Sequence, residues 1–156
     1  MNDALVETWR INACINLYLL DALSPEQLVA PVAKGKTAVG HLAHVHNVRL
    51  MWLKAAAEEL LEGVEKLDPK AADGAALREA LGRSADRIGT LIERAETPEG
   101  RVKGFKPHCA GFVGYLIAHE SFHRAQVELG LRQAGLPLSD KVAYGMWEWG
   151  ARGATS

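Results

Sequence analysis

The segment PHCAGFVGYLIAHESFHRAQVELGLRQA, residues 107–134, has the pattern of one long helix that decides the fold. Pro107 suits the first position of a helix, and Gly135 suits the position that follows the last turn. The sequence therefore predicts a helix over residues 107–134.

Three other segments share this helical periodicity. Apolar residues recur at steps of three and four over residues 3–23, 37–63 and 75–95. A shorter helical segment follows at residues 141–149, and no strand-like alternation extends beyond a few residues. We therefore predict an all-α fold, a four-helix bundle with a short C-terminal helix.

The same pattern bears on domain organisation. No linker or composition shift divides the sequence, so we expect a single helical bundle domain over residues 1–150. Residues 151–156 are predicted to form a flexible tail. The sequence leaves open whether the long helices alternate in direction or include a crossover connection.

Composition and charge exclude several classes of protein. The 156 residues fit one domain, and 18 Lys and Arg against 19 Asp and Glu give a net charge of −1. This balance argues against nucleic-acid binding and against an electrostatic membrane anchor. The N-terminus lacks the pattern of a signal peptide, and two cysteines are too few for a disulfide framework. We expect a cytoplasmic protein with neither a nucleic-acid nor a membrane partner.

The histidines indicate the chemistry. His119 and His123 are four residues apart on one predicted helix, so both imidazoles project from one face and can reach one metal ion. A third ligand has to come from another helix, and His44 lies in the middle of the predicted helix 37–63. His41, one turn earlier, could replace His44 as the ligand or contact a ligand from behind.

The other histidines fit this site less well. His46 projects about 200° away from His44, so we expect it on the surface. His108 lies roughly 16 Å along the helix from His119, which favours a place at the helix start. The alternative for all of these histidines is that they are hydrogen-bonded core residues. The paired spacing of His119 and His123 favours a metal over this alternative.

Glu120 gives the segment the form His-Glu-x-x-His, in which zinc proteases use the glutamate as a general base. We take Glu120 as a candidate catalytic residue for proton transfer. It could instead pair with Arg124 or line the rim of a pocket. No histidine follows His123, so the third ligand of the long metalloprotease motif is missing.

Further polar residues could surround the metal. Asn12 and Asn16 form a pair on the predicted first helix and could line the cavity or face solvent. Tyr115 lies one turn before His119 and could offer its hydroxyl to a ligand, or simply pack its ring. Gln126 could hold a ligand imidazole in place.

The residues VGHLAH (39–44), Arg49, Trp52-Leu53, GYLIAHESFHRAQ (114–126) and LRQAG (131–135) carry a family likeness. With them, the chain resembles the DinB/YfiT-like family of metal-dependent enzymes, a superfamily of four-helix bundles. The likeness covers nearly the whole chain. Members often have a second histidine and a glycine where this chain has Phe122 and Ala125.

The resemblance implies three metal ligands by position, which are His44, His119 and His123. It implies one divalent ion, zinc or nickel, with water at the remaining positions. It also implies a homodimer and a small-molecule substrate, with a low-molecular-weight thiol as a further partner. We therefore predict a metalloenzyme that activates water or a thiol for hydrolysis or group transfer. The alternative is a non-catalytic bundle that binds a metal or a small ligand.

Overall fold

The computed structural model describes residues 3–32 and 35–154. The protein is all-α, and among the described residues there is no strand beyond an isolated bridge between Pro31 and Thr37. The four long helices are α1 (Asp3–Ala22), α3 (Ala38–Ala56), α4 (Gly74–Arg94) and α5 (Cys109–Gln133). The short ones are α2 (Pro25–Val29), the 3₁₀ helix η2 (Glu58–Leu61), α6 (Asp140–Gly145) and α7 (Trp149–Ala154).

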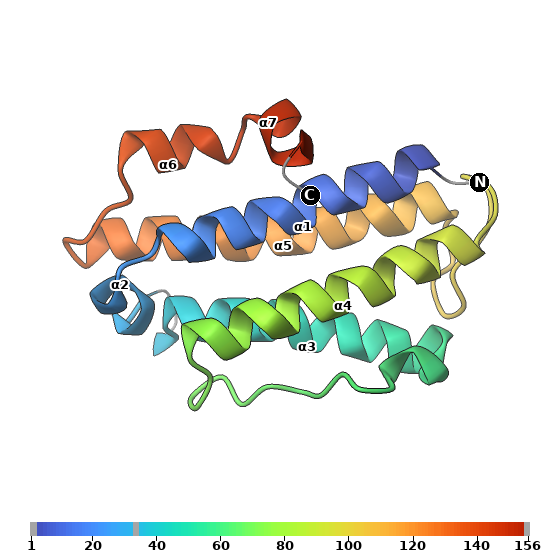
Figure 1. Ribbon diagram of the computed structural model, residues 1–156, viewed down its shortest axis with the longest axis horizontal. Coiled ribbons are helices and arrows are strands. Elements are labelled where there is room, and N and C mark those ends of the chain that lie inside the picture. The colour runs from blue at the N-terminus through green and yellow to red at the C-terminus, as the bar shows by residue number, and fades with distance from the viewer. Residues whose placement is uncertain (1–2, 33–34, 155–156) are drawn as a thin grey trace.

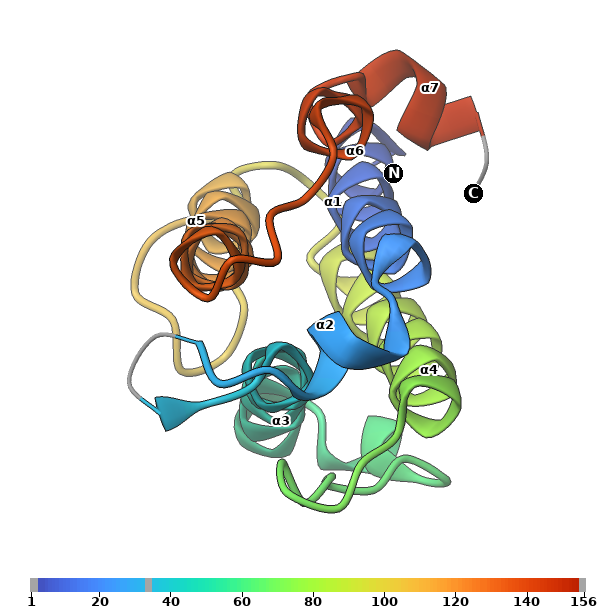
Figure 2. The same cartoon turned by 90° about the vertical axis from the view of Figure 1, so that its left-hand side faces the viewer.

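The four long helices lie side by side around a shared interior (Figures 1 and 2). Helix α1 packs against α4 and α5, and α3 packs against the same two helices. Helices α1 and α5 run in one direction, whereas α3 and α4 run in the other (Figure 1). Residues 62–73 return along the length of the molecule between α3 and α4, so the connectivity includes a crossover.

The helix ends follow from local chemistry. Ser24 starts α2 with a capping box, and the Thr37 hydroxyl accepts a hydrogen bond from the Gly40 N–H at the start of α3. His108 starts α5, because its ring Nδ1 accepts from the Gly111 N–H at 3.0 Å. Gly135 follows α5 with a φ of 77°, a left-handed conformation that suits glycine. The predicted place of His108 at a helix start is confirmed.

One long helix is shorter than its sequence pattern. The predicted helix 37–63 ends at Ala56, because the backbone leaves the helical region at Ala57 (φ −158°, ψ 74°). The chain continues as η2, whose buried Leu60 packs in the same core cluster as Leu53. No glycine or proline marks the break, so periodicity alone extends the helix too far.

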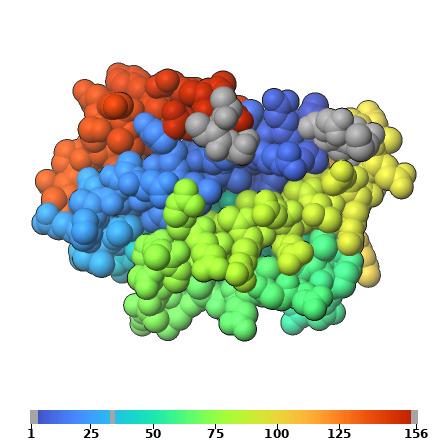
Figure 3. Space-filling view, viewed as in Figure 1, coloured from blue at the N-terminus to red at the C-terminus, as the bar shows by residue number. Residues whose placement is uncertain are grey.

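The C-terminal segment also differs from the pattern. The single helix expected over 141–149 is divided into α6 and α7 around the buried Met146. Residues 151–154, expected in a flexible tail, belong to α7, which packs against α1. Residues 155 and 156 lie outside the described residues. Figure 3 shows the red C-terminal segment lying against the blue N-terminal helix.

Candidate metal centre

Three histidines from two helices converge between α3 and α5. His44 lies on α3, and His119 and His123 lie one turn apart on α5. One ligand nitrogen from each residue lies within 4.8 Å of the other two. The ring centroids are 4.7 Å apart for His44–His123 and His119–His123, and 5.4 Å apart for His44–His119. This group could hold a metal ion, as predicted from the spacing.

The protonation state suits a metal. Desolvation by burial lowers the pKa of each of the three histidines below the ordinary 6.5, with the largest shift at His123, to about 3. Their mutual repulsion adds to the lowering at His44 and His123. The rings are therefore neutral at pH 7, which is the form that coordinates metals.

The donor set also fits a metal. The Nδ1 atom of His119 is buried and has no hydrogen-bond partner among the described residues. A buried nitrogen of this kind costs free energy unless something binds it. Three neutral imidazoles with an unsatisfied nitrogen match the ligands of zinc and related ions.

His41 lies directly behind one of the three histidines. It is buried, and its Nδ1 lies 3.0 Å from the Nδ1 of His123. This contact leaves the Nε2 of His123 as its remaining ring nitrogen. Metal-binding histidines usually donate their second N–H to a neighbouring acceptor, which fixes the ring orientation, and His41 lies where such an acceptor would be.

The prediction for His46 is wrong. We expected it on the surface, but it is fully buried, and its Nε2 lies 2.8 Å from the backbone oxygen of Glu65. Glu65 belongs to the returning connection 62–73, which covers the side of α3 that faces away from α5. Helical periodicity cannot show this cover, because the connection has no regular pattern.

Glu120 takes part in a buried ion pair. The Nε of Arg49 donates to Oε1 of Glu120 at 2.5 Å, and Nη2 donates to Oε2 at 3.1 Å. The amides of Asn12 and Asn16 donate to the same Oε2 at 2.7 and 3.2 Å. Both carboxylate oxygens therefore accept hydrogen bonds inside the protein.

The ion pair extends into a network that joins the four long helices. The Nη1 of Arg49 donates to Ser84 Oγ on α4, and the Nη1 of Arg124 donates to the Oδ1 atoms of Asn12 and Asn16 on α1. We call this group the buried network, and it comprises Asn12, Asn16, Arg49, Ser84, Glu120 and Arg124. The sequence analysis missed Arg49 as the partner of Glu120, although a charge within the apolar run of α3 was a usable signal.

The buried network shows where Asn12, Asn16 and Glu120 lie, compared with what the sequence left open. Asn12 and Asn16 do not face solvent, because both are fully buried and hydrogen-bonded to Glu120 and Arg124. Glu120 forms its ion pair with Arg49, whereas the asparagines link it to Arg124. Burial lowers the pKa of Arg124 to about 10, so it is still charged at pH 7.

The remaining candidates, Tyr115 and Gln126, also lie on α5. Tyr115 is 42% exposed, and its ring packs against Trp52 and Phe105. The Oε1 of Gln126 is buried without a hydrogen-bond partner in the described ranges. Both residues lie within two turns of His119, on the same helix.

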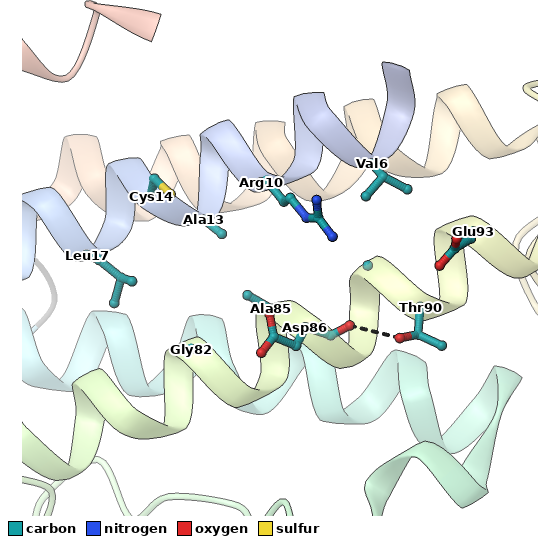
Figure 4. Close-up of a pocket in the computed structure, with 11 residues that line it drawn as sticks. Val6, Arg10, Ala13, Cys14, Leu17, Gly82, Ala85, Asp86, Thr90 and Glu93 are labelled. Carbon is teal, nitrogen blue, oxygen red and sulfur yellow. Dashed lines mark hydrogen bonds between the residues drawn. The ribbon is translucent and has the colours of Figure 1, made fainter. Parts of the chain in front are cut away.

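A separate groove of about 480 Å³ lies between α1 and α4 (Figure 4). Its lining includes Arg10, Cys14 and Asp86, and none of the three clustered histidines. The groove is therefore distinct from the candidate metal centre between α3 and α5.

The fold and the centre define a class of protein: all-α chains in which two long helices bring three histidines together. The sequence model of the DinB family matches residues 1–148. The chain belongs to the DinB family, as the resemblance indicated. No curated protein and no solved structure matches the chain. No helix among the described residues is long and apolar enough to cross a membrane.

Proposed function

We propose that the protein is a metal-dependent enzyme in which His44, His119 and His123 hold one divalent ion. The observation that carries the proposal is the convergence of three neutral imidazoles from two helices within 4.8 Å. A divalent ion bound there would lower the pKa of water or of a thiol, for hydrolysis or group transfer on a small molecule. Zinc and nickel both suit imidazole ligands.

The chain's own residues position this site. His41 holds the ring of His123 through the 3.0 Å contact between their Nδ1 atoms. The Arg49–Glu120 pair joins α3 to α5, the two helices that carry the histidines. We assign Glu120 to positioning rather than to proton transfer, because donors already occupy both of its oxygens.

Membership of the DinB family supports further proposals about architecture, assembly and substrate. We propose that the four long helices form the DinB-like four-helix bundle as a single domain over residues 1–150. We further propose a cytoplasmic homodimer that uses a low-molecular-weight thiol with its substrate.

The second candidate function is metal or small-ligand binding without turnover. It is favoured by the position of Glu120, since the one carboxylate within the His-Glu-x-x-His segment is engaged in the buried network. Activity assays separate the two functions.

The test begins with the metal content of the purified protein. We expect about one equivalent of a transition metal, and His119→Ala should lose it, whereas His108→Ala at the helix start should retain it. Thiol-transfer and hydrolysis assays on metal-loaded and chelated protein then test catalysis. Metal without activity supports the binding function. A metal-free protein whose stability is unchanged by chelators contradicts metal binding in both functions.

A further inference from the structure

A second cavity lies on the opposite side of α5 from the histidines. It has a volume of about 220 Å³ and lies between α1, α5 and the C-terminal segment. Figures 1 and 2 show α6 and α7 running alongside α1. Most of the walls are apolar, from Ile15, Ile117, Met146, Trp147 and Trp149.

Arg124 also lines this cavity, and it brings a buried charge to it. Its exposed fraction is only 8%. Its Nη1 is held by the neutral asparagine oxygens, at 2.8 and 2.7 Å, which fixes the guanidinium. Within the described ranges no acceptor is hydrogen-bonded to Nε or Nη2, so these donors can serve a ligand.

The buried network has one more positive charge than negative. It contains two guanidinium groups, and Arg49 takes both oxygens of Glu120, the only carboxylate in the network. Glu128, the other charged residue of the cavity lining, pairs with Arg132 at 3.4 Å. Arg124 is thus left without a direct carboxylate partner, and a buried charge of this kind favours an added anion.

We propose that this cavity binds a small organic monoanion with an apolar body. The carboxylate or sulfonate of the ligand would accept hydrogen bonds from Arg124, which prefers such planar acceptors. The apolar body would pack between Trp147, Trp149 and Ile117. A volume of about 220 Å³ equals roughly seven water molecules at about 30 Å³ each, which suits a single substituted ring.

Isothermal titration of the full chain with benzoate tests the charge. Benzyl alcohol has a similar shape without the charge, and we expect it to bind at least about tenfold more weakly. Arg124→Lys keeps a positive charge but loses the planar fork, and we expect a similar loss for benzoate. Equal affinity for the two probes, or no saturable benzoate binding, would overturn the proposal.

A second pair of variants tests the location. Ala125→Leu fills the cavity and should abolish benzoate binding, whereas Ala118→Leu, also exposed on α5 but outside the lining, should not change it. If circular dichroism shows that Ala125→Leu is misfolded, Trp147→Ala replaces it. Trp147 is 79% exposed, so its removal opens one wall and spares the core. Unchanged benzoate affinity in the folded variant contradicts the proposed site.

Discussion

The histidine cluster and the buried network use neighbouring residues of α5 for opposite purposes. His119 is followed by Glu120, and His123 by Arg124, but each step along a helix turns the side chain by about 100°. The histidines face α3 with an unsatisfied nitrogen, whereas Glu120 points to the interior with every oxygen engaged. The histidine cluster could hold an ion, whereas both carboxylate oxygens of Glu120 are already hydrogen-bonded within the protein.

The largest expected effect comes from breaking the ion pair in the buried network. Arg49→Ala leaves the carboxylate of Glu120 buried without its charge partner, which should reduce the free energy of unfolding by about 3–5 kcal/mol. Urea denaturation of the chelated protein measures this loss. The control is Arg83→Ala, whose ion pair with Glu79 is exposed and should contribute about 0–1 kcal/mol. Equal losses in the two variants would remove the distinction between the regions.

The second effect comes from binding a metal ion to the histidine cluster. Zinc at about 100 times its dissociation constant should raise the free energy of unfolding by about 2.7 kcal/mol, because the ion binds the folded state. Thermal unfolding with and without the metal measures the gain. His119→Ala should abolish it, while Arg83→Ala should leave it intact. A gain that persists in His119→Ala contradicts the assigned ligand.

The third effect concerns the residue behind the cluster. His41→Ala removes the contact with His123 but no proposed ligand, so metal affinity should fall about 10–100-fold without being lost. Competition with a coloured chelator measures the affinity. His46→Ala is the matched control, because His46 is buried on the same helix but bonded to Glu65. If metal affinity falls equally in the two variants, His41 does not position the metal ligand His123.

The fourth effect is a pH dependence of the metal-free protein. The clustered histidines have pKa values below 6.5 in the folded protein. Around and below pH 6.5 the unfolded chain therefore binds more protons than the folded chain. Stability should therefore fall as the pH drops from 6.5 to 5, by at most about 1.4 kcal/mol per pH unit for each histidine. Urea titrations at several pH values test this. His123→Leu should flatten the slope, and an unaltered slope speaks against the assignment.

Periodicity was enough for the local features. The positions of the long helices and the shared face of His119 and His123 depend on residues a few positions apart, so the sequence could predict them. The choice between His44 and His41 stayed open, because both lie near one face of α3 and only the packing of α5 separates their roles.

Long-range packing explains the misses. Arg49 and Glu120 are 71 positions apart, and no local pattern pairs them. His46 was wrongly predicted on the surface, because the irregular connection 62–73 covers the side of α3 that faces away from α5. The break at Ala57 carries no local signal in the sequence, and the buried Leu60 that follows it packs in the same cluster as Leu53.

The closure of the interior by α5 has a consequence for the order in which the protein matures during synthesis. The three earlier long helices leave the ribosome first, and with them Arg49 emerges before Glu120, its ion-pair partner. A nascent chain that stops short of Glu120 therefore lacks the carboxylate that pairs with Arg49. Synthesis of the final third supplies Glu120 and completes the ion pair. Truncated products should be readily cleaved by proteases.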